Sequence, residues 1–209
     1  MDKTKKSNSP ADSWTEVILI YSSALKQIST KLEILNDEFQ HVHSYNPIEH
    51  IKSRIKSSES IVKKLKKYGY ESTIENMVEY VNDIAGIRVI CSFTSDIYKI
   101  AAMIRNQNDI KVITIKDYIK NPKPSGYKSY HMLVEVPIYL SDRLVHAKAE
   151  IQIRTVAMDF WATLEHKINY KFEGNVPQDI KDELVESSRM ISDLDAKMLR
   201  LNQQIQDIN

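Results

Sequence analysis

Two acidic residues stand in short motifs that could hold a metal ion beside a phosphate. Asp83 lies in NDIAGIRVI, where we expect a helix to stop and a strand to begin, and Glu150 lies in the strand-like run AEIQIRT. Carboxylate oxygens suit Mg²⁺, which keeps several waters and shares its other positions with substrate phosphates. The turn at Ala85-Gly86 would also bring Arg88 to a sheet edge, where ligands commonly bind. An Asp83–Arg88 ion pair that closes the turn is the simpler alternative.

Basic side chains dominate residues 50–70, in which Glu59 is the only acid. The apolar positions follow a helical period, so we predict one helix that opens at Pro47 and ends near Gly69. Four lysines at steps of four, seven and four would share one face of it, flanked by Arg54 and Lys64: Lys52, Lys56, Lys63 and Lys67. Like charges stacked in this way repel until an anion screens them, which favours a cradle for a polyphosphate. A solvated helix face is the alternative.

The loop from Asn121 to His131 carries two tyrosines, two lysines and a histidine among prolines and a glycine. Flat rings beside cations suit a nucleobase that stacks on an aromatic face with its phosphates nearby. The alternative is that the tyrosines anchor a turn to the core.

In the run AEIQIRT, alternate side chains of a strand would share a face, so Glu150, Gln152 and Arg154 would point together, away from the core. Such alternation alone indicates only a solvated sheet face. A cleft shared with Asp83 and the tyrosine loop would explain all four clusters together. Carboxylates, cations and an aromatic platform are the groups needed to move a phosphoryl or pyrophosphoryl group with a divalent metal.

The composition excludes several classes of protein and site. The four glycines lie too far apart for a glycine-rich phosphate loop, so side chains must hold any phosphates. A net charge of +1 argues against a polybasic nucleic-acid binder, and the single cysteine excludes a disulfide framework. No apolar run is long enough to span a bilayer, and the first residues lack the apolar core of a signal peptide. We therefore expect a cytoplasmic protein that does not enter a membrane.

The elements that must position these residues form an α+β pattern. We expect a tail over residues 1–13 and a single domain over 14–209, with helices near 72–82, 97–104 and 157–168 and strands near 87–93, 111–115, 130–140 and 144–155. Long amphipathic helices are predicted near both ends, at about 14–42 and 178–208, each with a coiled-coil-like apolar stripe. These helices could pack within the chain or against a partner chain.

Four motifs, in order, resemble those of a known family. DIAGIRVICSF, SGYKSYH, EIQIRT and AMDFWATLEHKINYK are similar to the synthetase domain of the RelA/SpoT group, above all to its small alarmone synthetases. The resemblance runs from about Tyr21 to the C-terminal helix, and residues 20–56 resemble the RelP type more than the RelQ type. It implies a nucleotidyltransferase-like α+β fold, with a mixed sheet of about five strands flanked by helices. It also implies transfer of the β,γ-pyrophosphate of ATP to the 3′-hydroxyl of GDP or GTP, giving (p)ppGpp.

The resemblance also implies roles for individual residues. Asp83 and Glu150 would hold Mg²⁺, and Glu150 would also draw the proton from the attacking hydroxyl. Arg54 and Arg88 would sandwich adenine, and three lysines would line the ATP phosphates: Lys56, Lys64 and Lys67. Tyr127 would stack on guanine, and four further side chains would contact the acceptor nucleotide: His131, Lys116, Lys123 and Gln152.

Two departures from relatives affect these roles. Asp159 stands where RelQ-like members have asparagine, and its carboxylate would accept hydrogen bonds from guanine. Lys67 stands where relatives have arginine, so the charge is kept without bidentate geometry.

The resemblance further implies a homotetramer, in keeping with the terminal stripes. Because no His-Asp dipeptide occurs in the chain, we expect synthesis of the alarmone without its hydrolysis. A relative that pyrophosphorylates the tRNA 3′ end, and a non-catalytic nucleotide- or RNA-binding module, are the alternatives; the near-neutral charge gives little support to RNA binding.

Overall fold

The computed structural model describes residues 10–172 and 175–207 and contains six helices and one five-stranded sheet in these ranges. The elements, in chain order, are α1 (Pro10–His43), β1 (Ile48–Ile55), α2 (Ser58–Tyr68), α3 (Ile74–Tyr80), β2 (Ala85–Cys91), α4 (Thr94–Arg105), β3 (Lys111–Asp117), β4 (Tyr130–Tyr139), β5 (Leu144–Thr155), α5 (Val156–Lys171) and α6 (Gln178–Gln206). The strand order is β1-β2-β5-β4-β3. Only β2 and β5 run parallel, so the sheet is mixed and the predicted α+β fold is confirmed.

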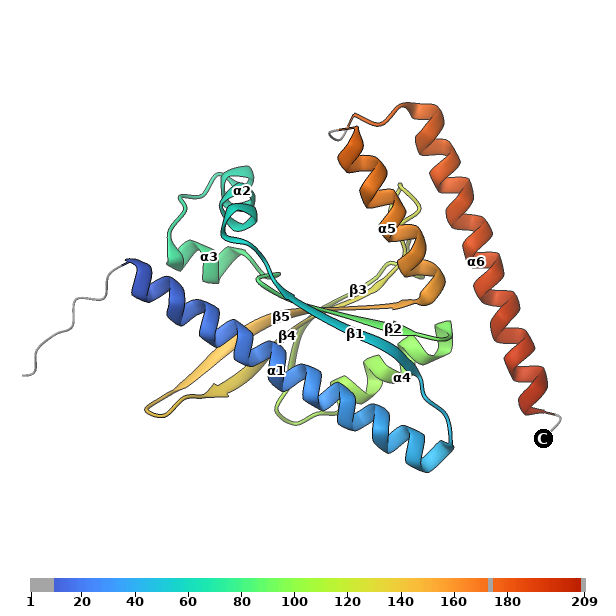
Figure 1. Ribbon diagram of the computed structural model, residues 1–209, viewed down its shortest axis with the longest axis horizontal. Helices are drawn as coiled ribbons and strands as arrows, with labels where there is room; N and C mark the ends of the chain where they lie inside the picture. Colours follow the sequence, from blue (N-terminus) through green and yellow to red (C-terminus); the bar gives the residue numbers. More distant parts are fainter. Residues whose placement is uncertain (1–9, 173–174, 208–209) are drawn as a thin grey trace, which may run out of the picture.

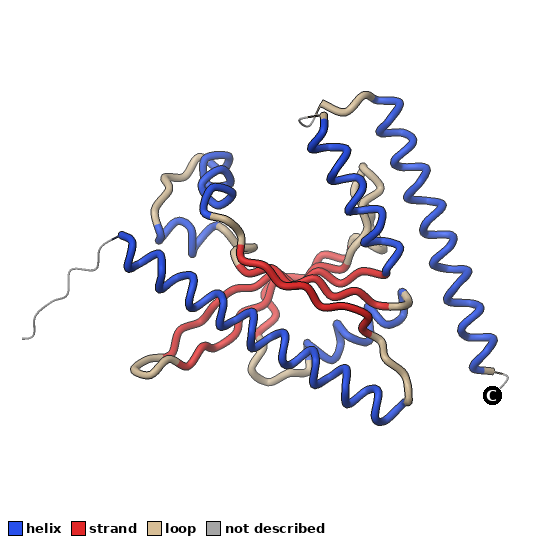
Figure 2. The backbone as a smooth tube through the Cα atoms, in the orientation of Figure 1, coloured by secondary structure: helices blue, strands red, loops and turns tan. Residues whose placement is uncertain are grey.

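The helices divide between the two sides of the twisted sheet (Figures 1 and 2). α1 and α4 cover one side, whereas α2 and α3 lie toward one end of the sheet and α5 and α6 toward the other. The core forms between the first pair and the strands, where Ile28 of α1, Ile100 of α4 and Ile151 of β5 are fully buried. This leaves the side chains on the opposite side of β2 and β5 to form a site.

The apolar stripe of α1 is buried within the chain. Tyr21, Leu25, Ile28 and Leu32 belong to the core, and α1 contacts β1, β2, β4 and β5. The sequence left open whether this stripe packs within the chain or against a partner chain. In the structure, most of it packs within the chain. The helix begins at Pro10, so the expected tail is too long by the residues 10–13; residues 1–9 lie outside the described ranges.

α6 presents its stripe to solvent. Its inner side contacts α5 and α4, and the Trp161 indole N–H donates to the carbonyl of Leu184 at 3.0 Å. The large apolar side chains on its outer side are 43–61% exposed: Met190, Leu194, Met198, Leu201 and Ile205. The apolar stripe predicted from the sequence also includes Leu184, Ile191 and Ile208. Leu184 and Ile191 are half-buried, and Ile208 lies outside the described residues. No helix among the described residues is long and apolar enough to cross a membrane.

The predicted single helix from Pro47 to Gly69 is wrong. Residues 48–55 form β1, which pairs antiparallel with β2 at the sheet edge, and α2 begins only at Ser58. Ser57 caps the helix by accepting a hydrogen bond from the Ser60 N–H. The β-branched residues of this segment favour a strand, and at an edge only part of the strand is buried, so its apolar spacing imitated a helical period. The four lysines therefore do not share one helix face.

Candidate active site

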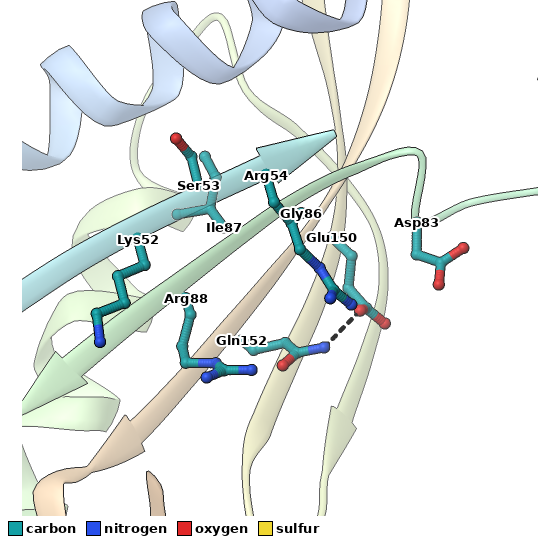
Figure 3. A pocket seen from close by; sticks show the side chains of 9 residues that line it. All are labelled: Lys52, Ser53, Arg54, Asp83, Gly86, Ile87, Arg88, Glu150 and Gln152. Carbon is teal, nitrogen blue, oxygen red and sulfur yellow. Dashed lines mark hydrogen bonds between the residues drawn. The ribbon is translucent and has the colours of Figure 1, made fainter. Parts of the chain in front are cut away.

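The two acidic residues meet at the sheet surface (Figure 3). Asp83 lies in the turn between α3 and β2, and Glu150 lies on β5, paired in register with Gly86 of β2. Parallel pairing of β2 and β5 thus brings together carboxylates that are far apart in the sequence. Both side chains line the same two cavities, one of about 260 Å³ and the other of about 220 Å³.

The larger cavity, which we call the arginine pocket, lies over β1, β2 and β5 (Figure 3). In the register of β1 and β2, Arg54 faces Gly86 and Lys52 faces Arg88, so both arginines and Lys52 border the same hollow. Its lining comprises Lys52, Ser53, Arg54, Asp83, Gly86, Ile87, Arg88, Glu150 and Gln152. Two planar guanidinium groups beside two carboxylates make this pocket suitable for an aromatic base with a phosphate chain.

The smaller cavity, which we call the tyrosine pocket, lies on the other side of the acid pair. Its lining comprises Lys64, Tyr68, Tyr80, Asn82, Asp83, Thr114, Lys116, His131, Leu133 and Glu150. Lys116 and His131 face one another across β3 and β4, and His131 is paired with Gln152 of β5. The sheet register therefore places these predicted residues beside Glu150.

Two lysines hold the Asp83 carboxylate. Lys56 Nζ lies 2.9 Å from Oδ2 and Lys64 Nζ lies 2.8 Å from Oδ1. Burial alone would raise the pKa of Asp83, but the hydrogen bonds and charges of Lys64 and Lys56 outweigh it and lower the pKa below its ordinary value. Asp83 is therefore ionised at neutral pH. Lys67 is exposed on the last turn of α2 and lines neither pocket, so the structure does not bring it to the acid pair.

Two side chains point donors at the Glu150 carboxylate. Gln152 Nε2 donates to Oε2 at 2.7 Å, and His131 Nδ1 lies 3.4 Å from Oε1. Burial would raise the pKa of Glu150, but the hydrogen bonds from His131 and Gln152 lower it overall. Both carboxylates of the pair are thus held in the charged form by their neighbours, which is the form that binds a metal ion.

The tyrosine loop reaches the site through Tyr127. Its hydroxyl lies 2.9 Å from His131 Nε2, and Lys123 Nζ lies 4.7 Å from its ring centroid. Gly126 has a φ of 88°, a left-handed conformation that favours glycine, and its carbonyl accepts a hydrogen bond from Ser188 of α6 at 2.5 Å. The Tyr127 hydroxyl therefore reaches His131, which lines the tyrosine pocket, and Gly126 ties the loop to α6.

Asp159 is held by two arginines. Arg88 Nη1 and Arg154 Nη1 both lie 3.1 Å from its Oδ1, so the residue predicted to read guanine is joined to a residue of the arginine pocket. The simpler alternative, an ion pair between Asp83 and Arg88, does not form, because Arg88 pairs with Asp159 and Asp83 pairs with lysines. Arg154, expected on a polar strand face, is only 4% exposed.

Lys52, expected in a polyphosphate cradle, lines the arginine pocket. Four residues that line the tyrosine pocket were not predicted from the sequence: Tyr68, Tyr80, Asn82 and Thr114. Helical and strand spacing could have indicated two of them. Tyr68 follows Lys64 by four residues and so shares its helix face, and Thr114 precedes Lys116 by two residues on the same strand. Nothing in the local pattern singles out Tyr80 or Asn82.

Comparisons with known proteins agree with this geometry. The family profile described as "Region found in RelA / SpoT proteins" matches residues 53–175. The GTP pyrophosphokinase YwaC of Bacillus subtilis is 47% identical over 194 residues, which cover 93% of this chain and 92% of that protein. The GTP pyrophosphokinase YjbM of the same organism is 35% identical, with 93% and 90% covered.

Solved structures give the same result. Small alarmone synthetase 2 of Bacillus subtilis matches with a TM-score of 0.84 and 46% identity, and covers 92% of this chain and 99% of its own. Small alarmone synthetase 1 of that organism, bound to its product pppGpp, matches with a TM-score of 0.85 and 35% identity, with 92% and 98% covered. The fold, the matched region and these relatives together show that the chain belongs to the RelA/SpoT family and is similar to its small alarmone synthetases.

Proposed function

We propose that the protein transfers the β,γ-pyrophosphate of ATP to the 3′-hydroxyl of GDP or GTP and so makes ppGpp or pppGpp. The single observation that carries this proposal is that two pockets meet at one pair of ionised carboxylates, Asp83 and Glu150. A reaction between two nucleotides needs two such pockets with the charged groups between them. The GTP pyrophosphokinase activity by which the relatives are named, and the pppGpp bound to one solved relative, support the same reaction.

The arginine pocket is suited to ATP. Arg54 and Arg88 would stack on adenine, because a planar guanidinium can lie flat against a base. Lys56 and Lys64 now neutralise Asp83, and we propose that they contact the ATP phosphates when the donor binds. We assign a lesser role to Lys67, because its side chain is exposed away from the acid pair.

The tyrosine pocket and the adjoining loop are suited to the acceptor. Tyr127 would stack on guanine, and Lys116, His131 and Gln152 lie close to Glu150, where the 3′-hydroxyl must arrive. Lys123, which now lies over the Tyr127 ring, would follow the nucleotide phosphates. Asp159 would read guanine only through the part of its carboxylate not engaged by the two arginines. Glu150 would accept the proton of the attacking hydroxyl.

The acid pair also fits a magnesium ion. Pyrophosphokinases of this family generally need a divalent metal. Among the described residues no group of three or more metal-binding side chains occurs, and two carboxylates are what Mg²⁺ uses when substrate phosphates and water complete its shell. Asp83 and Glu150 would hold the ion, which would offset the charge on the transferring pyrophosphoryl group.

A transfer assay tests the proposal. The protein is incubated with Mg²⁺ and ATP labelled at the γ-phosphate, together with GDP, GTP or deacylated tRNA. Label is expected in ppGpp or pppGpp and not in tRNA, and product made in advance is expected to remain intact because hydrolysis is not proposed. Label in tRNA would favour the tRNA-modifying alternative, and label in neither would favour a non-catalytic module.

The Glu150→Gln variant tests the role of the acid pair. Its amide is nearly the same size but can neither take a proton nor hold a metal ion well, so turnover is expected to be lost while nucleotide binding persists. Glu135→Gln is a matched control, because Glu135 lies on β4 outside both pockets and pairs with Lys111. A near-normal rate for Glu150→Gln would refute the assigned role.

The outer stripe of α6 supports a homotetramer. Met190, Leu194, Met198 and Leu201 recur at steps of four, four and three, and all are exposed in the single chain. A sustained apolar stripe of this kind is typical of a helix that packs against another helix. We propose that it joins copies of this chain. Since the substrates are cytoplasmic nucleotides, we also propose that the enzyme works in the cytoplasm.

A further inference from the structure

Arg154 is a buried charge at the centre of the site whose role the proposed reaction does not explain. It lies near the end of β5, and four of its N–H groups reach four different side chains: Ser129 Oγ at 3.3 Å, Asp159 Oδ1 at 3.1 Å, Tyr127 OH at 2.5 Å and Gln152 Oε1 at 3.0 Å. A buried charge is costly unless its hydrogen bonds are satisfied. The number of different partners indicates that Arg154 organises its surroundings.

One path from Arg154 runs through the ring residues to Glu150. Arginine can only donate, so the Tyr127 hydroxyl accepts from Arg154 and its own proton is left to donate to His131 Nε2 at 2.9 Å. A neutral imidazole that accepts at Nε2 carries its proton at Nδ1. That Nδ1–H faces Glu150 Oε1 at 3.4 Å. The direction of each bond on this path therefore follows from the arginine.

A second path from the same nitrogen runs through Gln152. The amide oxygen of Gln152 accepts from Arg154 NH2, so its amino group must point the other way. There, Nε2 donates to Glu150 Oε2 at 2.7 Å. The two carboxylate oxygens of Glu150 thus receive one donor each, and both paths begin at one terminal nitrogen of Arg154.

We propose that Arg154 is a positioning residue that sets the direction of both hydrogen-bond paths, so that His131 and Gln152 each donate to the Glu150 carboxylate and fix its orientation. Its catalytic consequence rests on the proposed function of Glu150. Lysine cannot replace it, because a single ammonium lacks the planar fork that reaches four partners at once. Without Arg154 the imidazole and the amide can both reverse and turn lone pairs toward a carboxylate.

The ring tautomer of His131 tests this inference without any reaction. Protein labelled with ¹⁵N in its histidines is examined by NMR without nucleotides, in the alkaline range where the His131 signals no longer change with pH. The His131 signals are assigned from their loss in His131→Asn. In the wild type we expect the proton on Nδ1. In Tyr127→Phe, which keeps the ring and removes the relay hydroxyl, and in Arg154→Met, we expect a shift toward the Nε2–H tautomer.

Two results would overturn the inference: an Nε2–H tautomer in the wild type, or an unchanged Nδ1–H tautomer in both variants. Tyr127→Phe keeps the test valid if Arg154→Met does not fold. Arg105→Met is the matched control, because Arg105 is an exposed arginine in the last turn of α4, and it should leave the tautomer unchanged.

Kinetics give a second readout. Tyr127→Phe should lower kcat about 10–100-fold, the usual effect of losing a residue that orients a catalytic group, while the KM for GDP stays nearly constant because the stacking ring is kept. Arg154→Lys should lower kcat as Arg154→Met does, because lysine cannot make the same bonds. A rise in KM alone would contradict the positioning role. If the wild type shows the Nδ1–H tautomer but makes no labelled product, the proposed function fails while the directed network stands.

Discussion

The contact between Gly126 and α6 predicts a large, measurable cost for Gly126→Ala. Gly126 has a φ of 88°, and a Cβ placed on it would lie 2.8 Å from the Ser188 Cβ. A left-handed conformation costs a residue with a side chain about 1–2 kcal/mol, and forcing an extra carbon into a packed site costs about 1–3 kcal/mol. We therefore expect Gly126→Ala to lower the free energy of unfolding by about 2–5 kcal/mol.

A second substitution separates the two parts of this cost. Ser188→Gly removes the opposing Cβ, so in that background Gly126→Ala should cost only the conformational part, about 1–2 kcal/mol. Ser188→Ala is the matched control: it keeps the Cβ and removes the hydroxyl that donates to the Gly126 carbonyl, so the full cost should remain.

Urea unfolding followed by circular dichroism, at one fixed protein concentration, measures each variant. The KM for GDP, measured in parallel, should rise in Gly126→Ala because the loop carries Tyr127. The reasoning is refuted if Gly126→Ala lowers the free energy of unfolding by the same amount in the wild type and in the Ser188→Gly background, because then the close contact with α6 contributes nothing.

Three other predictions follow from the site and the surface. Tyr127→Ala should raise the KM for GDP about 10–100-fold and leave the KM for ATP unchanged, since base stacking contributes about 1–3 kcal/mol. Tyr139→Ala is the control, because Tyr139 is 79% exposed. A change confined to the KM for ATP would contradict the placement of Tyr127. Because the pKa of Asp83 is lowered on folding, the stability that its charge provides is present above its ordinary pKa and is lost as the pH falls below about 4. The urea midpoint of Asp83→Asn should therefore depend less on pH in this acidic range than the midpoint of the wild type. Parallel curves for the two proteins would refute this. A Leu194→Glu, Leu201→Glu double variant should reduce the particle mass in light scattering while keeping the circular dichroism of the folded chain, and an unchanged mass would argue against the α6 interface.

These point changes test the interface better than deleting residues 184–209. In the structure, the inner side of α6 holds the tyrosine loop through Ser188 and also through Ser192, which accepts from Lys128 at 2.5 Å. Deletion would therefore disturb the site and the interface together.

Sheet-forming segments with strong patterns could be predicted from the sequence. β4 alternates buried and partly exposed residues along nearly its whole length, and β5 does so from Ala147 to Ile153. A period of two therefore predicted both strands and the face that each side chain takes. The meeting of Asp83 with Glu150 was only a hypothesis, because it depends on β2 lying parallel to β5, and a local pattern does not specify which strands pair.

The failures have physical causes. β1 lies at the sheet edge, so only its first residue, Ile48, is fully buried, and the partial burial of Ile51 and Ile55 left an apolar spacing that imitates a helix. The capping serine at Ser57 was the available signal for a break before α2. Arg154 was placed on an open polar face because alternation predicts which side a residue takes, whereas its burial comes from Asp159 of α5 and from the tyrosine loop, which arrive from elsewhere in the chain.

The hydrogen bonds between α6 and the tyrosine loop affect when the chain can complete its site during translation. The segments that carry Asp83 and Glu150 leave the ribosome before α6 does, since they precede it in the chain. Until α6 has emerged and folded, the loop around Gly126 lacks the hydrogen bonds from Ser188 and to Ser192. A nascent chain, or one clipped before α6, would thus lack the bonds that hold the loop of Tyr127. Under the proposed function, such incomplete copies would bind the acceptor nucleotide poorly and would make little ppGpp or pppGpp.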